Sequence, residues 1–391
     1  MNKIKLLLLI FGVLNLSVSI AQTAEPTGTI EIRAKAENLT GMANSGSEGI
    51  VSGLRIAALP ILRPGEIMEM VPGLIVTQHA GDGKANQYFL RGFNLDHGTD
   101  FATYVNGVPA NMPTHAHGQG YTDLNFLIPE LVDLIAYKKG TYSAMDGDFS
   151  AAGSARLEYR KSLDGHLAEV TAGANGYKRL LLAGSPKRQD GQWLYGLEVF
   201  KNDGPWLVPE NYQKLNGVLS YSDGTRLNGY SVTGMLYKSS WISTDQVPLR
   251  AINQGLIGRF GSLDPTTGGE THRYSVSSQW AQTGKDRQTK ANFWALDSAL
   301  DLWSNFEYCT GSIEKTGNCA AGDQFKQAEK RKAFGFGLSE ARYHQLSLLN
   351  SKYESAFTFG LDGRSDNISP VGLYKTTRRA VTETVREDAA I

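Results

Sequence analysis

The chain has 391 residues, 39 of them basic and 39 acidic, so its formal net charge at pH 7 is zero. Without a basic surplus or a basic stripe, the composition argues against a nucleic-acid partner. Its 43 glycines, its 10% of aromatic residues and its lack of long apolar runs in the mature part favour an exported β protein.

The N-terminus has the features of a secretory signal peptide. Lys3 and Lys5 flank the start of an apolar run at 4–14, and Ser19 and Ala21 occupy the two small-residue positions of a cleavage site. The sequence therefore predicts a signal peptide at 1–21 and an exported protein. The apolar run is shorter than the ~20 residues that a membrane-spanning helix needs, and no later segment reaches that length. A membrane location would then require a closed β-barrel.

Residues 26–160 have the texture of a compact α+β unit. The segment RPGEIMEMVPG (63–73) predicts a short helix that ends at Pro72 and Gly73. Asn106-Gly107 supplies two positions that tolerate positive φ, so it predicts a tight hairpin. A helical turn is predicted at the start of 127–140. Strands are predicted at 74–80, at 86–93, within 102–112, in the second part of 127–140 and at the end of 146–162.

From about residue 163 onward, apolar and polar residues alternate in segments of about ten residues. In QWLYGLEVF (192–200), one face carries Trp193, Tyr195, Leu197 and Val199. The range 214–239 predicts a hairpin with its turn at Asp223-Gly224, in which Leu215, Leu219 and Tyr221 oppose Asn216, Ser220 and Ser222. A second hairpin is predicted from 272–280 through 283–288 to 289–298. This pattern favours the strands of an outer-membrane barrel. A soluble β-sandwich or β-helix also alternates and stays open as an alternative.

Several motifs in the first half occur in a recognisable order. They are TGTIEIRAKAE (27–37), EIMEMVPGLIV (66–76), YFLRGFN (88–94) with Arg91, Gly92 and Phe93, YVNGVP (104–109) with Asn106 and Gly107, and the segment 131–162. Together they resemble the plug domain of TonB-dependent outer-membrane receptors, and 27–37 resembles a TonB box. Asn106 stands where the family usually has Asp, so the chain resembles an atypical branch.

The resemblance implies a fold, a location and partners. It implies an α+β plug at 53–160, preceded by a flexible, TonB-box-containing N-terminus at 22–52 and followed by part of a transmembrane antiparallel β-barrel at 161–391. It implies uptake of a ferric siderophore or other metal chelate across the cell outer membrane, with no cofactor of its own. It also implies coupling to the TonB–ExbB–ExbD complex through Thr29, Ile30, Glu31 and Ile32. We expect Arg91 to pair with carboxylates and hold the plug against the barrel wall.

The chain is short for such a receptor. Plugged transporters have 22 strands, which at ~10 residues each would use nearly all of 161–391 and leave almost nothing for loops. We therefore expect an incomplete barrel, from a truncated product or a fragment of a longer reading frame.

The histidines of NMPTHAHGQGY (111–121) are the strongest candidates for direct ligand contact. His115 and His117 would face the same side of an extended segment and could reach one metal ion, with Asp100 and Asp123 as candidate further ligands. A glycine-rich loop with hydrogen-bonding histidines is the plainer reading. On either reading, we expect His115, His117, Gln119 and Tyr121 to face a ligand. His79 and His97 lie upstream.

None of the motifs G-x-S-x-G, CxxC, HExxH, Walker A and GxGxxG occurs in the sequence, and we expect no enzyme. An exported metal-dependent hydrolase and a non-transporting adhesion or structural protein of the outer membrane stay as alternatives. In an oxidising compartment, Cys309 and Cys319 are expected to form one local disulfide in an extracellular loop.

Overall fold

The computed structural model describes residues 46–186, 191–242, 245–308, 323–348 and 351–388. The predicted signal peptide, the segment 27–37 with Thr29–Ile32, and both cysteines lie outside these residues. The disulfide therefore stays a prediction. We expect Cys309 and Cys319 to resist alkylation in unreduced protein, and mass spectrometry that found both thiols alkylated would contradict it.

The first part of the described chain, residues 46–161, is called the N-terminal unit. It contains a five-stranded sheet in the order β1-β7-β8-β5-β6 and a three-stranded sheet in the order β2-β3-β4. Its strands are β1 (Glu48–Ser52), β2 (Leu74–Thr77), β3 (Gln87–Leu90), β4 (Phe93–Asn94), β5 (Phe101–Val105), β6 (Val108–Pro109), β7 (Val132–Lys138) and β8 (Gly153–Tyr159). Its helices are α2 (Gly53–Ala57) and the 3₁₀ helices η1 (Pro64–Met70), η2 (Pro129–Leu131) and η3 (Ala144–Asp146).

Local sequence explains most of these elements. The predicted helix at 63–73 is η1, which ends before Gly73, a residue with φ 85°. Asn106 and Gly107 have φ 46° and 77° and join β5 to β6, as the dipeptide predicted. The Asn106 side chain also accepts a hydrogen bond from the Tyr159 amide at 2.8 Å, which ties the hairpin to β8. The buried core between the strands and helices includes Ile67, Val71, Leu127, Ile128, Leu131, Ile135 and Leu157.

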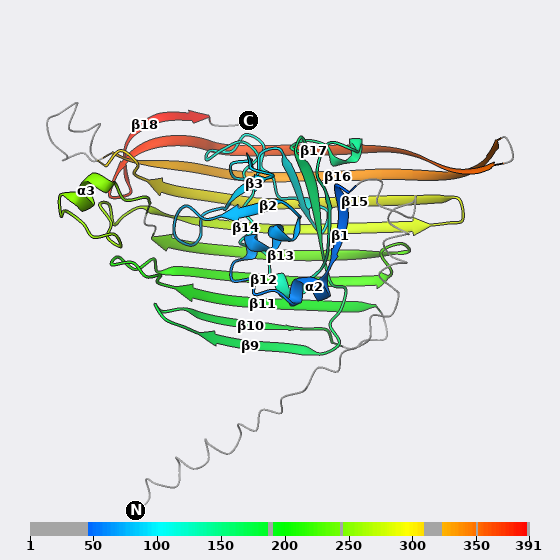
Figure 1. Cartoon of the computed structure of the whole chain (residues 1–391), viewed down its shortest axis with the longest axis horizontal. Helices are drawn as coiled ribbons and strands as arrows, with labels where there is room; N and C mark the ends of the chain where they lie inside the picture. Colours follow the sequence, from blue (N-terminus) through cyan, green and yellow to red (C-terminus); the bar gives the residue numbers. More distant parts are fainter. Residues whose placement is uncertain (1–45, 187–190, 243–244, 309–322, 349–350, 389–391) are drawn as a thin grey trace, which may run out of the picture. The chain divides into compact units, whose positions relative to one another are not determined.

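The rest of the described chain forms one ten-stranded antiparallel sheet with β9 and β18 at its edges. Figure 1 shows its strands side by side in sequence order, with the N-terminal unit on one face. The strands are β9 (His166–Ala172), β10 (Lys178–Gly184), β11 (Gln192–Asn202), β12 (Tyr212–Gly224), β13 (Gly229–Ile242), β14 (Gly268–Thr283), β15 (Arg287–Ser304), β16 (Gln324–Leu348), β17 (Ser351–Thr377) and β18 (Ala380–Asp388). A short helix, α3 (Leu249–Asn253), lies between β13 and β14.

The two faces of this sheet have opposite character. On β12, Leu215 and Leu219 are exposed, whereas Asn216 and Ser222 are buried on the opposite face. The same reversal occurs on β14, where Tyr274 is exposed and Arg273 is buried. An apolar outward face and a polar inward face are typical of a barrel strand that meets lipid. The predicted α+β unit followed by barrel-like antiparallel strands is therefore confirmed.

The connections between strands differ at the two ends of the sheet. The three longest, 203–211, 243–267 and 305–323, join strands at what we call the long-connection end, on the left of Figure 1. The turns 225–228 and 284–286 lie at the opposite end. This asymmetry is the one expected of a barrel with short periplasmic turns and long extracellular loops.

Three details differ from the sequence expectations. The β12–β13 turn was expected at Asp223-Gly224, but Gly224 pairs with Gly229 and the turn is 225–228. Residues 48–52, expected in the flexible N-terminus, form β1 and pair with β7. Strands β11 to β17 have 11 to 27 residues, longer than the segments of about ten residues expected from the sequence. Among the described residues, no helix is both long and apolar enough to cross a bilayer.

Candidate functional site

The 111–121 loop is held against the sheet by a buried arginine. The Arg331 side chain on β16 is fully buried, and its Nη2 donates to the carbonyl oxygens of Pro113 and Thr114 at 2.6 and 3.0 Å. Its Nε pairs with Glu329 at 2.8 Å and its Nη1 with Asp366 on β17 at 2.5 Å. A guanidinium presents several donors in a fixed plane, so one side chain can satisfy two carboxylates and two carbonyls.

Glu329 and Gln327 of β16 also bind the loop directly. The Ala116 amide donates to Glu329 Oε2 at 3.1 Å. Gln327 Nε2 donates to the Ala116 carbonyl at 2.8 Å, and Gln327 Oε1 faces His117 Nδ1 at 2.8 Å. Because these residues begin β16, the loop lies at the long-connection end of the sheet. The expectation that the loop faces a ligand stays a prediction.

Four histidines and a tyrosine gather at this point. His117 Nε2 lies 3.0 Å from His97 Nε2, and the His79 ring centroid lies 5.1 Å from that of His97. His97 Nδ1 contacts the Asn86 carbonyl oxygen at 3.0 Å. His97 is buried, whereas His79 and His117 are half-buried, so the cluster has an accessible side.

His115 and His117 do not converge on a common point. His115 stacks on Tyr121 with ring centroids 4.2 Å apart, and its Nδ1 accepts the His117 amide at 3.1 Å. Its Nε2 lies 3.8 Å from Glu329 Oε2. The sequence expected an extended segment with both rings on one side, but the tight turn of the loop separates them. The pair that does converge is His97 with His117.

The other two residues expected to face a ligand separate as well. Gln119 is exposed, and its side chain accepts the Thr114 amide at 3.0 Å. Tyr121 is buried, with its ring between the histidines. It therefore packs against the buried side of the histidine cluster, and the expectation that it faces a ligand is not met.

Burial keeps these imidazoles neutral. Desolvation lowers the pKa of His79 to about 4 and that of His117 to about 3, with the nearby Lys84 and the neighbouring histidines contributing in the same direction. The pKa values of His97 and His115 are lowered for the same first reason. A neutral imidazole keeps one nitrogen lone pair, which is the form that binds metal ions.

A complete metal site is not assembled in the described part of the chain. No group of three histidine, cysteine or carboxylate side chains there is arranged to hold a metal ion. Asp123, one of the carboxylates considered from sequence, is half-buried, and desolvation raises its pKa to about 6. Its Oδ1 accepts the Asn125 amide at 2.8 Å. Asp96 is nearer to the histidines, with Oδ1 3.8 Å from His97 Nε2.

Ion pairs from a strand and from a turn of the sheet hold the N-terminal unit to it. Arg179 on β10 makes a two-point pair with Glu130 at 2.7 and 3.0 Å, and its Nε contacts Glu198 at 2.7 Å. Arg226 pairs with Asp133 at 2.6 Å. Arg91, which was expected to do this, is exposed and donates to Ser47 Oγ at 3.1 Å within the N-terminal unit. That expectation was wrong, because Arg91 lies at the β3–β4 turn with φ 55°.

The two residues that follow Arg91 lie at the β3–β4 turn or directly after it. Gly92 has φ 81°, and Phe93 is exposed. Gly107 has a contact with the sheet, since its carbonyl accepts Asn292 Nδ2 at 3.2 Å. A side chain at Gly107 would approach Gln279 and Asn292 to 3.1 and 3.3 Å, so glycine suits both the turn and the contact.

A second contact joins the N-terminal unit to the connection 203–211. Glu210 is buried and accepts the Asp82 amide at 3.2 Å and the Trp206 indole N–H. Its carboxylate occupies the space where Gly81 would carry a Cβ. Burial raises the pKa of Glu210 to about 7, and the nearby Asp82 and Asp203 add to the shift.

This shift predicts a pH-dependent contact. The folded-state pKa exceeds the ordinary value of 4.5, so the stabilisation is present below pH 4.5 and is lost as pH rises through 7. We expect residues 203–211 to exchange amide hydrogens faster at pH 8 than at pH 5, after correction for intrinsic exchange. Glu210→Gln should remove most of this pH dependence. An unchanged dependence in that variant would assign it to another group.

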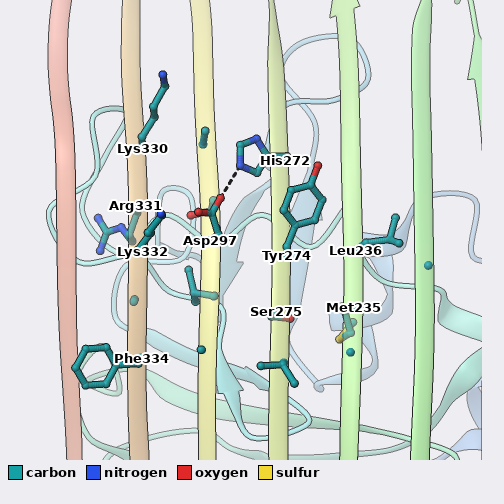
Figure 2. A pocket seen from close by; sticks show the side chains of 18 of the residues that line it. Met235, Leu236, His272, Tyr274, Ser275, Asp297, Lys330, Arg331, Lys332 and Phe334 are labelled. Atoms are coloured by element: carbon teal, nitrogen blue, oxygen red, sulfur yellow. Dashed lines mark hydrogen bonds and ion pairs between the residues drawn. The ribbon is translucent and has the colours of Figure 1, made fainter.

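A large hollow of the described surface lies elsewhere. It has a volume of about 1340 Å³ and lies over the outward side chains of β11 to β17. Figure 2 shows Leu236, Tyr274 and Phe334 around it, with the His272–Asp297 pair and Lys332 at its polar side. His272 Nε2 contacts Asp297 Oδ1 at 2.8 Å. Since these are outward residues of the apolar band, the hollow belongs to the surface expected to face lipid, and we do not place the ligand there.

Comparison with known proteins decides the family of the N-terminal unit. Residues 41–154 match the family model described as the TonB-dependent receptor plug domain. These residues are a TonB-dependent receptor plug domain. The plug domain therefore includes β1 and the loops that carry His79, His97 and His117.

Solved structures extend the likeness across the sheet. The chain resembles the copper transporter OprC (14% identity, TM-score 0.60), with 88% of this chain and 49% of that chain covered. It resembles the ferric citrate transporter FecA in its unliganded form (12%, 0.64, 88% and 51%). It also resembles the siderophore receptor PirA from Acinetobacter baumannii (14%, 0.54, 87% and 49%). The chain spans about half the length of these structures, and at such identities the likeness shows the fold of a plug domain with part of a receptor barrel.

Two groups of residues around the plug domain were not found from sequence. One is His97 with its partner Asn86, and the other is the set Gln327, Glu329 and Arg331. The sequence did contain a signal for the second group. Glu329 and Arg331 are charged residues at inward positions of a strand with alternating residues. Such charges indicate a polar partner on the inner face.

Proposed function

We propose that the protein is an outer-membrane receptor that imports a scarce metal complex with energy supplied through TonB. The observation that carries this proposal is a plug domain held by buried charges to the polar face of a sheet whose opposite face is apolar. An adhesin or structural protein has no need of a plug that can be moved relative to its wall. A hydrolase would need a catalytic group of residues, and none was recognised in the sequence or at the candidate site.

The proposed direction of uptake is supported by the difference between the two ends of the sheet. Long connections in barrels of this kind face the outside of the cell, and short turns face the periplasm. The histidine cluster of the plug domain lies at the long-connection end. Chain segment 159–161 lies at the other end, since Arg226 of the 225–228 turn donates to the Tyr159 carbonyl at 2.8 Å. The cluster is therefore placed where an external ligand would arrive first.

The ligand class is inferred from the chemistry of this cluster. Neutral imidazoles suit transition metals. Among similar structures are a copper transporter and a ferric citrate transporter, so metal uptake occurs with this fold. We propose a metal chelate, a ferric siderophore among the candidates, as the transported ligand, with no cofactor resident in the protein.

Coupling is proposed through the N-terminal segment. Residues 27–37, with Thr29, Ile30, Glu31 and Ile32, would add as a strand to TonB of the TonB–ExbB–ExbD complex. Export through the signal peptide at 1–21 would bring the protein to the outer membrane. These partners and this location are inferences from the family and the sequence.

Fractionation and pull-down test the proposal. We expect the protein in the outer-membrane fraction, which separates a receptor from an exported soluble hydrolase. We expect TonB to be recovered with the full-length protein and not with a variant in which residues 27–37 are replaced by a Gly-Ser segment of equal length. Equal recovery of TonB with both proteins, or none with either, would count against an energised receptor and favour an adhesion or structural protein.

A further inference from the structure

The hydrogen bonds around His97 and His117 determine which nitrogen of each ring carries a proton. Gln327 Nε2 donates to the Ala116 carbonyl, which orients the amide so that Oε1 faces His117. An amide oxygen is an acceptor only, so His117 Nδ1 carries the hydrogen of their 2.8 Å contact. In the same way, the Asn86 carbonyl requires His97 Nδ1 to be a donor at 3.0 Å.

Both remaining nitrogens are then acceptors. A neutral imidazole has one N–H, and each ring uses it on Nδ1. The two Nε2 atoms nevertheless lie 3.0 Å apart, so two lone pairs meet with no hydrogen between them. Such a contact is unfavourable unless a cation lies between or beside the two nitrogens. The two Nε2 atoms therefore form a binding position for a positive charge. The hydrogen bonds at the two Nδ1 atoms hold both rings in this orientation.

The dimensions suit a metal ion. Two imidazole nitrogens at 2.0–2.1 Å from one ion are about 2.8–3.4 Å apart for bond angles between square (90°) and tetrahedral (109.5°). The observed 3.0 Å falls in this range. The Asp96 carboxylate, 3.8 Å from His97 Nε2 and half exposed, adds negative charge on the open side. Lys84, the nearby cation, is buried with its Nζ 3.7 Å from Asp245, which offsets its charge.

We propose that His97 and His117 are two nitrogen ligands for a divalent transition metal ion whose other coordination positions belong to the molecule that carries it. This deepens the proposed function and rests on it for the source of the metal. The two-nitrogen donor set favours copper, nickel or zinc over a ferric complex already saturated by oxygen ligands. His115 positions the site, since it accepts the His117 amide and is not itself aimed at the metal.

The test is metal binding by the purified full-length receptor without a histidine tag. Cu²⁺, Ni²⁺ and Zn²⁺ are titrated separately, and electron paramagnetic resonance reports nitrogen ligation of Cu²⁺. We expect one ion per protein with two imidazole nitrogens bound. His117→Gln and His97→Gln should each weaken binding at least 100-fold, whereas His166→Gln, at an exposed histidine on β9, should leave it unchanged.

A further variant separates ligation from folding. His117→Cys offers another metal ligand at the same place and should restore binding of Zn²⁺ to within about tenfold, which a merely structural role for His117 would not explain. Absence of stoichiometric binding, or equal binding by wild type and both glutamine variants, would overturn the site. If metal accumulates in cells through TonB while these variants bind normally, the site is wrong and the proposed function stands. If the site binds metal but accumulation does not depend on TonB, the function falls and the site stands.

Discussion

Replacing Arg331 with methionine is expected to lower the free energy of unfolding by about 3–5 kcal/mol, because it leaves the buried Glu329 carboxylate without its cation. The side chain also provides the donors for the Pro113 and Thr114 carbonyls, so the 111–121 loop should lose its place on the sheet. Chemical denaturation gives the change in stability, and limited proteolysis within 111–121 reports the loop.

The same strand offers a matched control. Arg342 pairs with Glu340 two residues away at 2.7 Å, the same spacing as Arg331 with Glu329, but its side chain is 57% exposed. Arg342→Met should change stability by less than about 1 kcal/mol because water screens the pair. The double variant Glu329→Gln with Arg331→Met should recover part of the loss by removing the unpaired charge. Equal effects of Arg331→Met and Arg342→Met would show that burial of this network does not matter.

Proline at Ile30 or at Ile32 is expected to abolish energy-coupled uptake while leaving ligand binding at the plug intact. Strand addition uses backbone donors of the added segment, and proline removes one of them. Metal accumulation by starved cells, measured by mass spectrometry of total cell metal, reports uptake. Binding by the purified protein reports the plug site.

Thr40→Pro, just beyond the segment 27–37, serves as the control for a general effect of proline in the N-terminus. It should leave uptake near the wild-type level. Undiminished uptake in both isoleucine variants would mean that 27–37 is not the coupling segment.

Local chemistry made part of this structure predictable. Asn106 and Gly107 both tolerate the positive φ that a tight turn of this kind requires and that most other residues avoid, and the observed φ angles are positive at both positions. The alternation along β12 placed Leu215 and Leu219 on one face and Asn216 on the other because strand geometry alone sets this period. The order of plug motifs was informative because those at 66–76, 88–94 and 104–109 mark a helix end or a turn with a steric requirement.

The site was less predictable because its partners are distant in sequence. His97 meets His117 only after the β3–β4 turn folds the 94–100 loop back over the 111–121 loop. The protonation of His117 depends on Gln327, which belongs to another part of the fold. For Arg91 the error was of another kind. Arginine is a residue type suited to binding carboxylates of the barrel wall, so this role was predicted, but the sequence did not show that Arg91 lies at a turn. Side-chain roles of this kind depend on tertiary contacts that spacing does not encode.

Total cell metal in the presence and absence of TonB tests the receptor proposal most directly. Cells starved of transition metals would be compared with and without the full-length protein, each with and without functional TonB, and their iron, copper, nickel and zinc contents measured. We predict that the protein raises the content of at least one of these metals only when TonB is functional. Metal contents that are the same with and without the protein in TonB-competent cells, or that rise equally without TonB, would contradict an energy-coupled metal receptor.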